Sequence, residues 1–245
     1  MQRKMTVLVA AMLMTVWAVP GFAGDRAGDL GKVLEIYALR ADVAMHQAAA
    51  KAFRALADSY PADKEILLFC ARTAYFAAHR LKGDDKATTA TWGVECTQLL
   101  LKAHKNDYDG RYWWARNSLK ARESEGIQAA LKQAKVVRDF LGKLIEDEPT
   151  RFEGYMAQGA VLREIPGMLG GDKKKALEVL KKGYGIAPRD AELLLELAAA
   201  YAANGDKENA AAIYDKCIKE SDKPKYLEWE TEDARAYAKK MKAKL

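Results

Sequence analysis

The stretch that decides the fold is residues 191–222, AELLLELAAAYAANGDKENAAAIYDKCIKESD. Residues 191–203 are apolar at helical spacing, and residues 209–218 continue the same periodicity. Between them lies an Asn-Gly-Asp turn, in which Gly205 can adopt a positive φ and Asp206 can cap the following helix. The stretch therefore predicts two helices that pack as a hairpin.

Small and aromatic residues alternate along this hairpin at fixed positions. Small residues let paired helices approach each other, and aromatic residues fill the remaining space. The order is large, small, aromatic, turn, small, aromatic, small, and it is carried by Leu197, Ala198, Tyr201, Gly205, Ala210, Tyr214 and Cys217. This spacing resembles a tetratricopeptide repeat, with Cys217 at a position where alanine is usual.

Prolines recur along the chain at intervals that match the length of such a helical hairpin. Pro61, Pro149, Pro188 and Pro224 are separated by 88, 39 and 36 residues, and the polar stretch 105–107 divides the longest interval. Such a period is expected for stacked helix pairs, and abundant alanine with scattered Val and Ile argues against a large sheet. We predict an all-α, tetratricopeptide-like solenoid of about eleven helices in one domain, 24–245. Its helix pairs should lie at about 27–60, 62–106, 107–149, 150–188 and 189–224, with a C-terminal capping helix in 225–245.

Residues 1–23 have the pattern of a signal peptide. Arg3 and Lys4 precede an uncharged apolar run, and small residues at Gly21 and Ala23 form a cleavage pattern. The run is about fifteen residues, shorter than the roughly 20 that span a bilayer, so an uncleaved anchor is the less favoured alternative. We expect cleavage before Gly24, a periplasmic or secreted location, and no integral membrane span in the mature chain.

Charge and motifs exclude several classes of function. Without Arg3 and Lys4 the chain has 38 basic and 34 acidic residues with the signs interspersed, so nucleic-acid binding is not expected. No zinc-protease, hydrolase, phosphate-loop or dinucleotide-binding pattern occurs, and the three histidines have no partner in the sequence. We therefore predict a protein that is not an enzyme, with no catalytic residue, metal site or cofactor.

Cys70 and Cys96 lie about 13 residues on either side of a Lys-Gly-Asp turn at 82–84, so antiparallel helices would hold them at similar height. One interpretation is a disulfide, which an oxidising compartment permits. The favoured interpretation is that both are small buried residues at helix contacts. The spacing does not show whether the two helix faces agree, so both interpretations stay open.

Residues 112–117, Tyr-Trp-Trp-Ala-Arg-Asn, supply the first candidate binding residues. Adjacent tryptophans point about 100° apart on a helix, so both are fully buried only if the helix is enclosed on several sides. One of them could reach a concave surface or an interface, and the polar residues one turn on could orient a polar group. The favoured alternative is core packing between repeats. The candidates are Tyr112, Trp113, Trp114, Arg116 and Asn117.

An insertion at 165–172, Ile-Pro-Gly-Met-Leu-Gly-Gly-Asp, supplies the second set. Pro166 ends a helix and Asp172 caps the next one. Turn chemistry does not explain Met168 and Leu169, which predict contact with a partner, a pore or another repeat. The lysines at 173–175 could attract an anionic lipid or a phosphate group, although a solvated face is the favoured interpretation.

The order of these features resembles the T component of tripartite ATP-independent periplasmic (TRAP) transporters. The resemblance rests on export, on Tyr-Trp-Trp-Ala-Arg-Asn at 112–117 and on Ile-Pro-x-x-x-Gly-Gly-Asp-x-x-x-Ala at 165–176, and it covers about 107–188. It implies a subunit that assembles into a homo-oligomeric ring, encloses an apolar pore and docks a periplasmic solute-binding protein. Trp113, Trp114, Met168 and Leu169 would then serve the pore or the docking surface.

The sequence therefore predicts a non-enzymatic scaffold whose stacked helix pairs present a concave groove to a protein partner. A T-like transport accessory subunit is the most specific form of this hypothesis. The alternative is a carrier that encloses a small apolar ligand against Trp113 and Trp114. An enzyme with an unrecognised site is the third and least favoured hypothesis.

Overall fold

The computed structural model describes Phe22 and residues 24–245, and these residues form eleven α-helices and no strand. The predicted signal peptide lies, apart from Phe22, outside the described residues. The helices are α2 (Arg26–Ala38), α3 (Val43–Ser59), α4 (Lys64–Arg80), α5 (Gly83–Ala103), α6 (Tyr108–Arg122), α7 (Ile127–Asp147), α8 (Phe152–Glu164), α9 (Lys173–Ile186), α10 (Ala191–Ala203), α11 (Lys207–Glu220) and α12 (Glu228–Lys242). Short 3₁₀ turns η1 (Glu123–Glu125) and η2 (Gly167–Leu169) interrupt two connections. Within the described part of the chain, no helix is long and apolar enough to cross a membrane.

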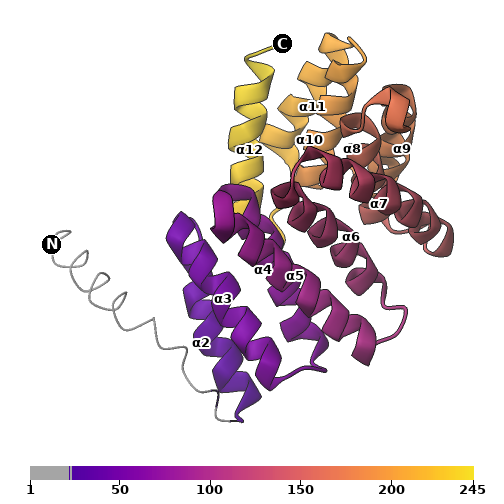
Figure 1. Ribbon diagram of the computed structural model, residues 1–245. Coiled ribbons are helices and arrows are strands. Elements are labelled where there is room, and N and C mark those ends of the chain that lie inside the picture. The colour runs from indigo at the N-terminus through magenta and orange to yellow at the C-terminus, as the bar shows by residue number, and fades with distance from the viewer. Residues whose placement is uncertain (1–21, 23) are drawn as a thin grey trace, which may run out of the picture.

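The helices are joined as antiparallel pairs that stack on one another (Figure 1). The pairs are α2/α3, α4/α5, α6/α7, α8/α9 and α10/α11, with α12 packed on the last pair. First helices of neighbouring pairs also touch: α4 contacts α6, α8 contacts α10, and α10 contacts α12. The predicted all-α helical-hairpin solenoid is therefore confirmed, and α4, α6, α8, α10 and α12 share an inner face.

Aspartates begin six of the helices. Each carboxylate accepts a hydrogen bond from the backbone N–H three residues later, which satisfies one of the free donors at the helix start. The six N-caps are Asp42, Asp63, Asp107, Asp172, Asp190 and Asp206. In the turn before α11, Gly205 has φ +83°, a conformation that glycine adopts without strain. Local sequence therefore determines where most helices start.

Small residues set the spacing within the pairs. A Cβ added to Gly159 would lie 2.4 Å from Cγ of Leu180, so α8 and α9 are in close contact at this point. Cys217 occupies the last small position of the α10/α11 repeat and is fully buried, with Sγ 3.6 Å from the carbonyl oxygen of Ala191. The core thus follows the packing that the repeat pattern predicts.

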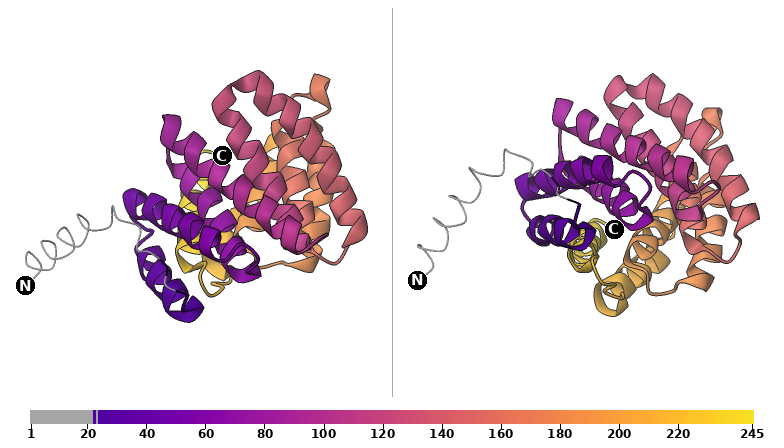
Figure 2. Two further views of the ribbon diagram at one scale, coloured as in Figure 1. Left: turned by 60° about the horizontal axis from the view of Figure 1, so that its bottom comes forward. Right: turned by 90° about the horizontal axis from the view of Figure 1, so that it is seen from below.

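The superhelix curves until its C-terminal segment meets its first helices (Figure 2). The sequence predicts α12 as a cap on an exposed end of the stack, and α12 does pack on α10 and α11. The residues before and at its start also contact α2 and the loop that follows it, through Tyr226 and Glu230. The small rotation between successive pairs accumulates over the solenoid, so its last element faces its first.

Candidate functional site

The inner face of the superhelix lines a partly open cavity of about 590 Å³, which we call the central cavity. Helices α4, α6, α8, α9, α10 and α12 and the loops before α10 and α12 supply its lining. Its apolar wall includes Tyr75, Phe76, Phe152, Ile186, Leu195, Leu227, Trp229 and Tyr237. Cavities of roughly 300–1,000 Å³ with a largely apolar lining are typical of ligand sites. The fold therefore provides a ligand-sized space bounded by side chains from both halves of the chain.

Arg116 of α6 is held in the wall by several polar contacts. Its guanidinium donates to Oη of Tyr112 (2.7 Å) and Oη of Tyr75 (2.5 Å), and forms a two-pronged ion pair with the carboxylate of Glu192. It also lies 4.0 Å from the centre of the Tyr75 ring. Burial lowers the pKa of Arg116, but the carboxylate of Glu192 and the two phenols outweigh burial and raise it. This network fixes α4, α6 and α10 relative to one another.

A second cavity of about 330 Å³ lies next to the first. It shares five lining residues with the central cavity: Tyr75, His79, Arg116, Glu192 and Glu196. The ion pair between Arg116 and Glu192 therefore borders both cavities. Further charged residues of this second cavity are Lys120, Glu123, Arg163 and Glu164. The inner face is thus one recess that the shared residues divide into two parts.

His79 lines both cavities and is exposed to solvent. Its ring packs edge-on against Tyr75, with ring centres 4.6 Å apart. Desolvation lowers the pKa of His79 well below its ordinary value, and the nearby cations Lys120, Arg116 and Lys86 lower it further. A neutral imidazole at neutral pH can exchange hydrogen bonds with a ligand. Among the described residues, no three His, Cys, Asp or Glu side chains converge closely enough to hold a metal ion.

Carboxylates supply most of the remaining polar lining. Asp190, the N-cap of α10, accepts a hydrogen bond from the backbone N–H of Leu193 at 2.8 Å. Burial raises the pKa of Asp190 to about 6. Burial also raises the pKa of Glu196, although Arg163, which bonds to it at 2.8 Å, acts in the opposite direction. The lining therefore holds carboxylates whose negative charge is incompletely compensated.

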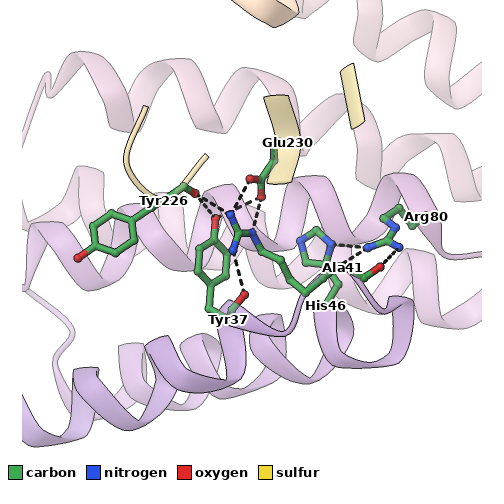
Figure 3. Close-up of polar contacts among 7 residues, drawn as sticks. Tyr37, Ala41, His46, Arg80, Tyr226 and Glu230 are labelled. Carbon is green, nitrogen blue, oxygen red and sulfur yellow. Dashed lines mark hydrogen bonds and ion pairs between the residues drawn. The ribbon is translucent and has the colours of Figure 1, made fainter. Parts of the chain in front are cut away.

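The superhelix is closed by seven residues that we call the closure cluster: Tyr37, Arg40, His46, Arg80, Tyr226, Trp229 and Glu230. Figure 3 shows the polar contacts of this cluster. The guanidinium of Arg40 donates to both oxygens of Glu230 at 2.8 Å and to the carbonyl oxygen of Tyr226 at 3.1 Å. Oη of Tyr37 donates to the same carbonyl at 2.8 Å. Tyr226 has φ +67°, a strained conformation for a bulky residue. The hydrogen bonds to its carbonyl oxygen hold Tyr226 in this backbone conformation.

The other half of the closure cluster surrounds Trp229, which also lines the central cavity. The guanidinium of Arg80 lies 4.4 Å from the Trp229 ring centre, and the His46 ring packs edge-on at 5.6 Å. Arg80 donates to the carbonyl oxygens of Arg40 and Ala41 at 2.7 Å each, and its Nη1 lies 3.2 Å from Nδ1 of His46 (Figure 3). One wall of the cavity therefore depends on closure of the superhelix.

Solved structures share this arrangement of helices. The structure is similar to that of TTC0263, a thermophilic tetratricopeptide-repeat protein of Thermus thermophilus, with a TM-score of 0.62 and 20% identity over 87% of this chain and 98% of that one. It is also similar to a tetratricopeptide-repeat protein from Parabacteroides merdae, with a TM-score of 0.59 and 13% identity over 97% of this chain and 80% of that one. The chain has the tetratricopeptide-repeat fold. The sequence matches no protein-family model and no curated protein.

Within this tetratricopeptide-repeat fold, the two predicted tryptophans are partly buried and pack against the core. The Trp113 ring packs against Tyr75, Phe76 and Tyr112, with ring centres 5.7, 6.1 and 5.1 Å away. The Trp114 ring packs against Phe140 of α7 at 4.9 Å. Neither tryptophan is among the described residues that line the central cavity. Trp113 instead supports two aromatic residues of the cavity wall from behind.

The other three candidates on α6 have different surroundings. Tyr112 is buried, and its hydroxyl accepts a hydrogen bond from Arg116. Asn117 is fully buried and donates to the carbonyl oxygens of Ala71 (3.1 Å) and Trp113 (2.9 Å), which joins α6 to α4. Of the five candidates on α6, Arg116 is the one that reaches the cavity lining.

Met168 and Leu169 lie on η2 and are 92% and 42% exposed. The loop is held to α7 by Arg138, which donates to the carbonyl oxygen of Gly170 at 3.0 Å. Neither apolar side chain lines the central cavity. The structure therefore separates these two candidates from Arg116 and places them on the outer surface.

Cys70 and Cys96 form a disulfide between α4 and α5, with Cα atoms 6.2 Å apart. This is the less favoured of the two interpretations of their spacing. Both sulfurs are fully buried, so the two residues also occupy small positions of the core. Facing positions on the two helices, which spacing did not determine, permit the bond.

Several residues of the site were not predicted from the sequence. They are Tyr75, Phe76, His79, Glu192, Glu196 and Trp229. Glu192 and Glu196 are the two charged residues of an otherwise apolar helix and lie one turn apart, which is a recognisable signal of a polar inner face. The role of Trp229 depends on closure of the superhelix, and no local pattern indicates it.

Proposed function

We propose that this protein is a non-enzymatic binding protein that holds a segment of a protein partner in its central cavity. The observation that carries the proposal is the cavity itself, which combines an aromatic wall with fixed charged groups. Aromatic residues supply contact area, and held polar groups fix the orientation of a bound chain. The polar groups already bonded to one another, such as Arg116 and Glu192, suit recognition better than proton transfer.

Photo-cross-linking tests this proposal directly. A photoreactive phenylalanine analogue replaces Phe76 in the cavity wall, and a matched variant carries it at Ile127, which is 76% exposed and outside the cavity. We expect a protein adduct from position 76 and not from position 127. Equal labelling at both positions would show that partners do not use the cavity.

We further propose that the chain acts in the periplasm or is secreted. The charge and apolar pattern of residues 1–23 supports export. The disulfide between Cys70 and Cys96 supports an oxidising compartment. Intact mass of the protein from cell fractions tests both points, since a mature chain that starts at Gly24 in the periplasm or medium is the expected result.

The most specific form of the proposal is an accessory subunit similar to the T component of TRAP transporters. It is supported by the exposed Met168 and Leu169 on η2, which suit contact with a periplasmic solute-binding protein or with another copy in a homo-oligomer. Replacing both with Ala should abolish that contact and leave the thermal midpoint unchanged. Native mass spectrometry that shows a monomer with no co-purifying solute-binding protein would contradict this form.

A second function is favoured by one observation, the volume of the central cavity. A space of about 590 Å³ can hold a small apolar ligand against Phe76, Trp229 and Leu195. Native mass spectrometry separates the two functions. A retained small molecule on a monomer would support a carrier, and its absence together with a protein adduct at position 76 would support the scaffold.

A further inference from the structure

The central cavity has the opposite charge to the chain as a whole. The chain carries 40 basic and 34 acidic residues. The cavity lining includes three guanidinium groups and six carboxylates, and His79 is neutral. The carboxylates are Asp190, Glu192, Glu196, Asp222, Glu230 and Asp233. The inner face is therefore acidic within a basic protein.

Four of these carboxylates have guanidinium partners. The pairs are Glu192 with Arg116, Glu196 with Arg163, Asp222 with Arg189, and Glu230 with Arg40. Asp190 and Asp233 remain. Asp190 accepts a backbone hydrogen bond and forms no ion pair, and Asp233 forms neither a hydrogen bond nor an ion pair with another described residue. Two acceptors in the lining are thus left for a ligand.

The three guanidinium groups of the lining already have partners within the protein, so they are not free to bind a ligand. Arg80 donates to the carbonyl oxygens of Arg40 and Ala41 and lies over Trp229. The other two guanidinium groups are in the ion pairs given above. An anionic ligand would therefore have to displace existing hydrogen bonds, whereas a cation would find free carboxylate oxygens.

The titration of the two free carboxylates agrees with this geometry. Burial raises the pKa of Asp190 to about 6. Asp233 is exposed, and partial desolvation raises its pKa, which the positive charge of Arg80 lowers again only in part. A bound cation would stabilise both charged forms.

Aromatic faces in the same lining suit the same kind of ligand. Phe76, Trp229 and Tyr237 line the cavity, and the Tyr237 side chain is 51% exposed. Ammonium and guanidinium groups bind over aromatic rings as well as to carboxylates. The overall positive charge of the protein disfavours unspecific binding of cations elsewhere on the surface.

We propose that the central cavity recognises a lysine or arginine side chain, so that the bound partner segment is a basic peptide. The cationic group contacts one of the two free carboxylates, Asp190 or Asp233, and its aliphatic stem lies along the aromatic wall. This inference rests on the proposed function, because it assumes that the cavity binds a peptide segment, and it adds the chemistry of that segment.

Selection from a random octapeptide library displayed on phage tests the proposal with the full mature chain. A double variant, D190N/D233N, removes both charges, and Asn at position 190 still caps α10 because Asn and Asp are equally good N-caps. The control variant is D139N/D206N, which changes one exposed helical carboxylate and one N-cap outside the cavity. Circular dichroism and thermal midpoints establish that both variants fold.

We expect the wild-type chain and D139N/D206N to enrich peptides that contain Lys or Arg. D190N/D233N should bind the selected peptide at least tenfold more weakly, because a charge-assisted hydrogen bond is lost. Enrichment of acidic or neutral peptides would overturn the inference and leave the proposed peptide-binding function in place. Equal affinity of both double variants would also overturn it, and the absence of any enrichment would contradict the proposed function as well.

Discussion

Arg40 and Glu230 form a buried ion pair across 190 residues of sequence, with the guanidinium donating to both carboxylate oxygens at 2.8 Å. Their side chains are 7% and 8% exposed. The pair exists only when the superhelix is closed, since Arg40 follows α2 and Glu230 lies in the first turn of α12. Removing one partner leaves the other charged and buried, which is far less favourable than the intact pair. The closure cluster should therefore be a cooperative part of the folded state.

Glu230→Gln should lower the free energy of unfolding by about 3–5 kcal/mol, because Arg40 loses its counter-charge in a buried position. Amide hydrogen exchange should rise in residues 224–242. Urea unfolding and hydrogen-exchange mass spectrometry measure the two effects. The control is Glu125→Gln, whose pair with Arg122 is 51% exposed on both sides and should contribute less than about 1 kcal/mol. Equal losses from the two variants would contradict a structural role for closure.

His46 should make the protein less stable on acidification. Burial lowers its pKa to about 3, and the positive charges of Arg80 and Arg40 contribute. The unfolded chain binds a proton near pH 6.5, whereas the folded chain does not, so the stabilisation is complete above pH 6.5 and is lost as the pH falls toward 3.

This effect amounts to at most about 1.4 kcal/mol for each pH unit in that range. His46→Asn keeps an acceptor for Arg80 and removes the titration. Urea unfolding at pH 7, 6 and 5 should therefore show a smaller decrease for the variant than for the wild type. Identical decreases in the two proteins would rule out His46 as a source of acid sensitivity.

The helices were predictable because their signals are local. The Asn-Gly-Asp turn at 204–206 specifies its own conformation, with Gly205 at positive φ and Asp206 as N-cap. Closure was not predictable in this way. The contact between Arg40 and Glu230 depends on the rotation accumulated over five helix pairs, and no short stretch of sequence encodes that sum.

The candidate site was predictable in part for the same reason. Helical spacing places Trp113 and Arg116 on α6, but it does not state which face of α6 meets the inner recess. The structure turns Arg116 toward the cavity and Trp113 toward α4. Trp229 lies on the last helix, so it belongs to the site only because the superhelix closes.

The cysteines provide a test of tertiary structure by thiol counting. The disulfide leaves Cys217 as the one free thiol of the chain. It is fully buried, and burial raises its pKa to about 11, so the reactive thiolate is scarce at neutral pH. A thiol reagent should find no reactive group in the native protein, one after denaturation and three after denaturation with reduction. Two additional thiols before reduction would contradict the disulfide.

Replacing both cysteines of the disulfide with Ser should lower stability. The bond spans 26 residues, and a cross-link of that length typically contributes about 3 kcal/mol by restricting the unfolded chain. Urea unfolding of C70S/C96S measures the loss. The same wild-type protein treated with a reductant serves as a control, because it loses the bond without gaining hydroxyl groups. Stability unchanged by both treatments would show that the bond does not form.

The ion pair between Arg116 and Glu192 allows the strength of the inner-face network to be measured. Arg116→Leu leaves Glu192 without its cation and leaves Oη of Tyr75 and Tyr112 without their donor. We expect a loss of about 1.5–3 kcal/mol in the free energy of unfolding, because charge-assisted hydrogen bonds are lost from side chains that are 11% and 32% exposed.

The double variant R116L/E192L should recover part of that loss, because it removes the unpaired charge and adds apolar contact between α6 and α10. The comparison is the cycle at Arg151 and Asp109, whose side chains are 38% and 32% exposed and whose coupling should be below about 1 kcal/mol. A coupling below about 1 kcal/mol between Arg116 and Glu192 would contradict this role. Arg116 would then not be the residue that fixes α4, α6 and α10 around the central cavity.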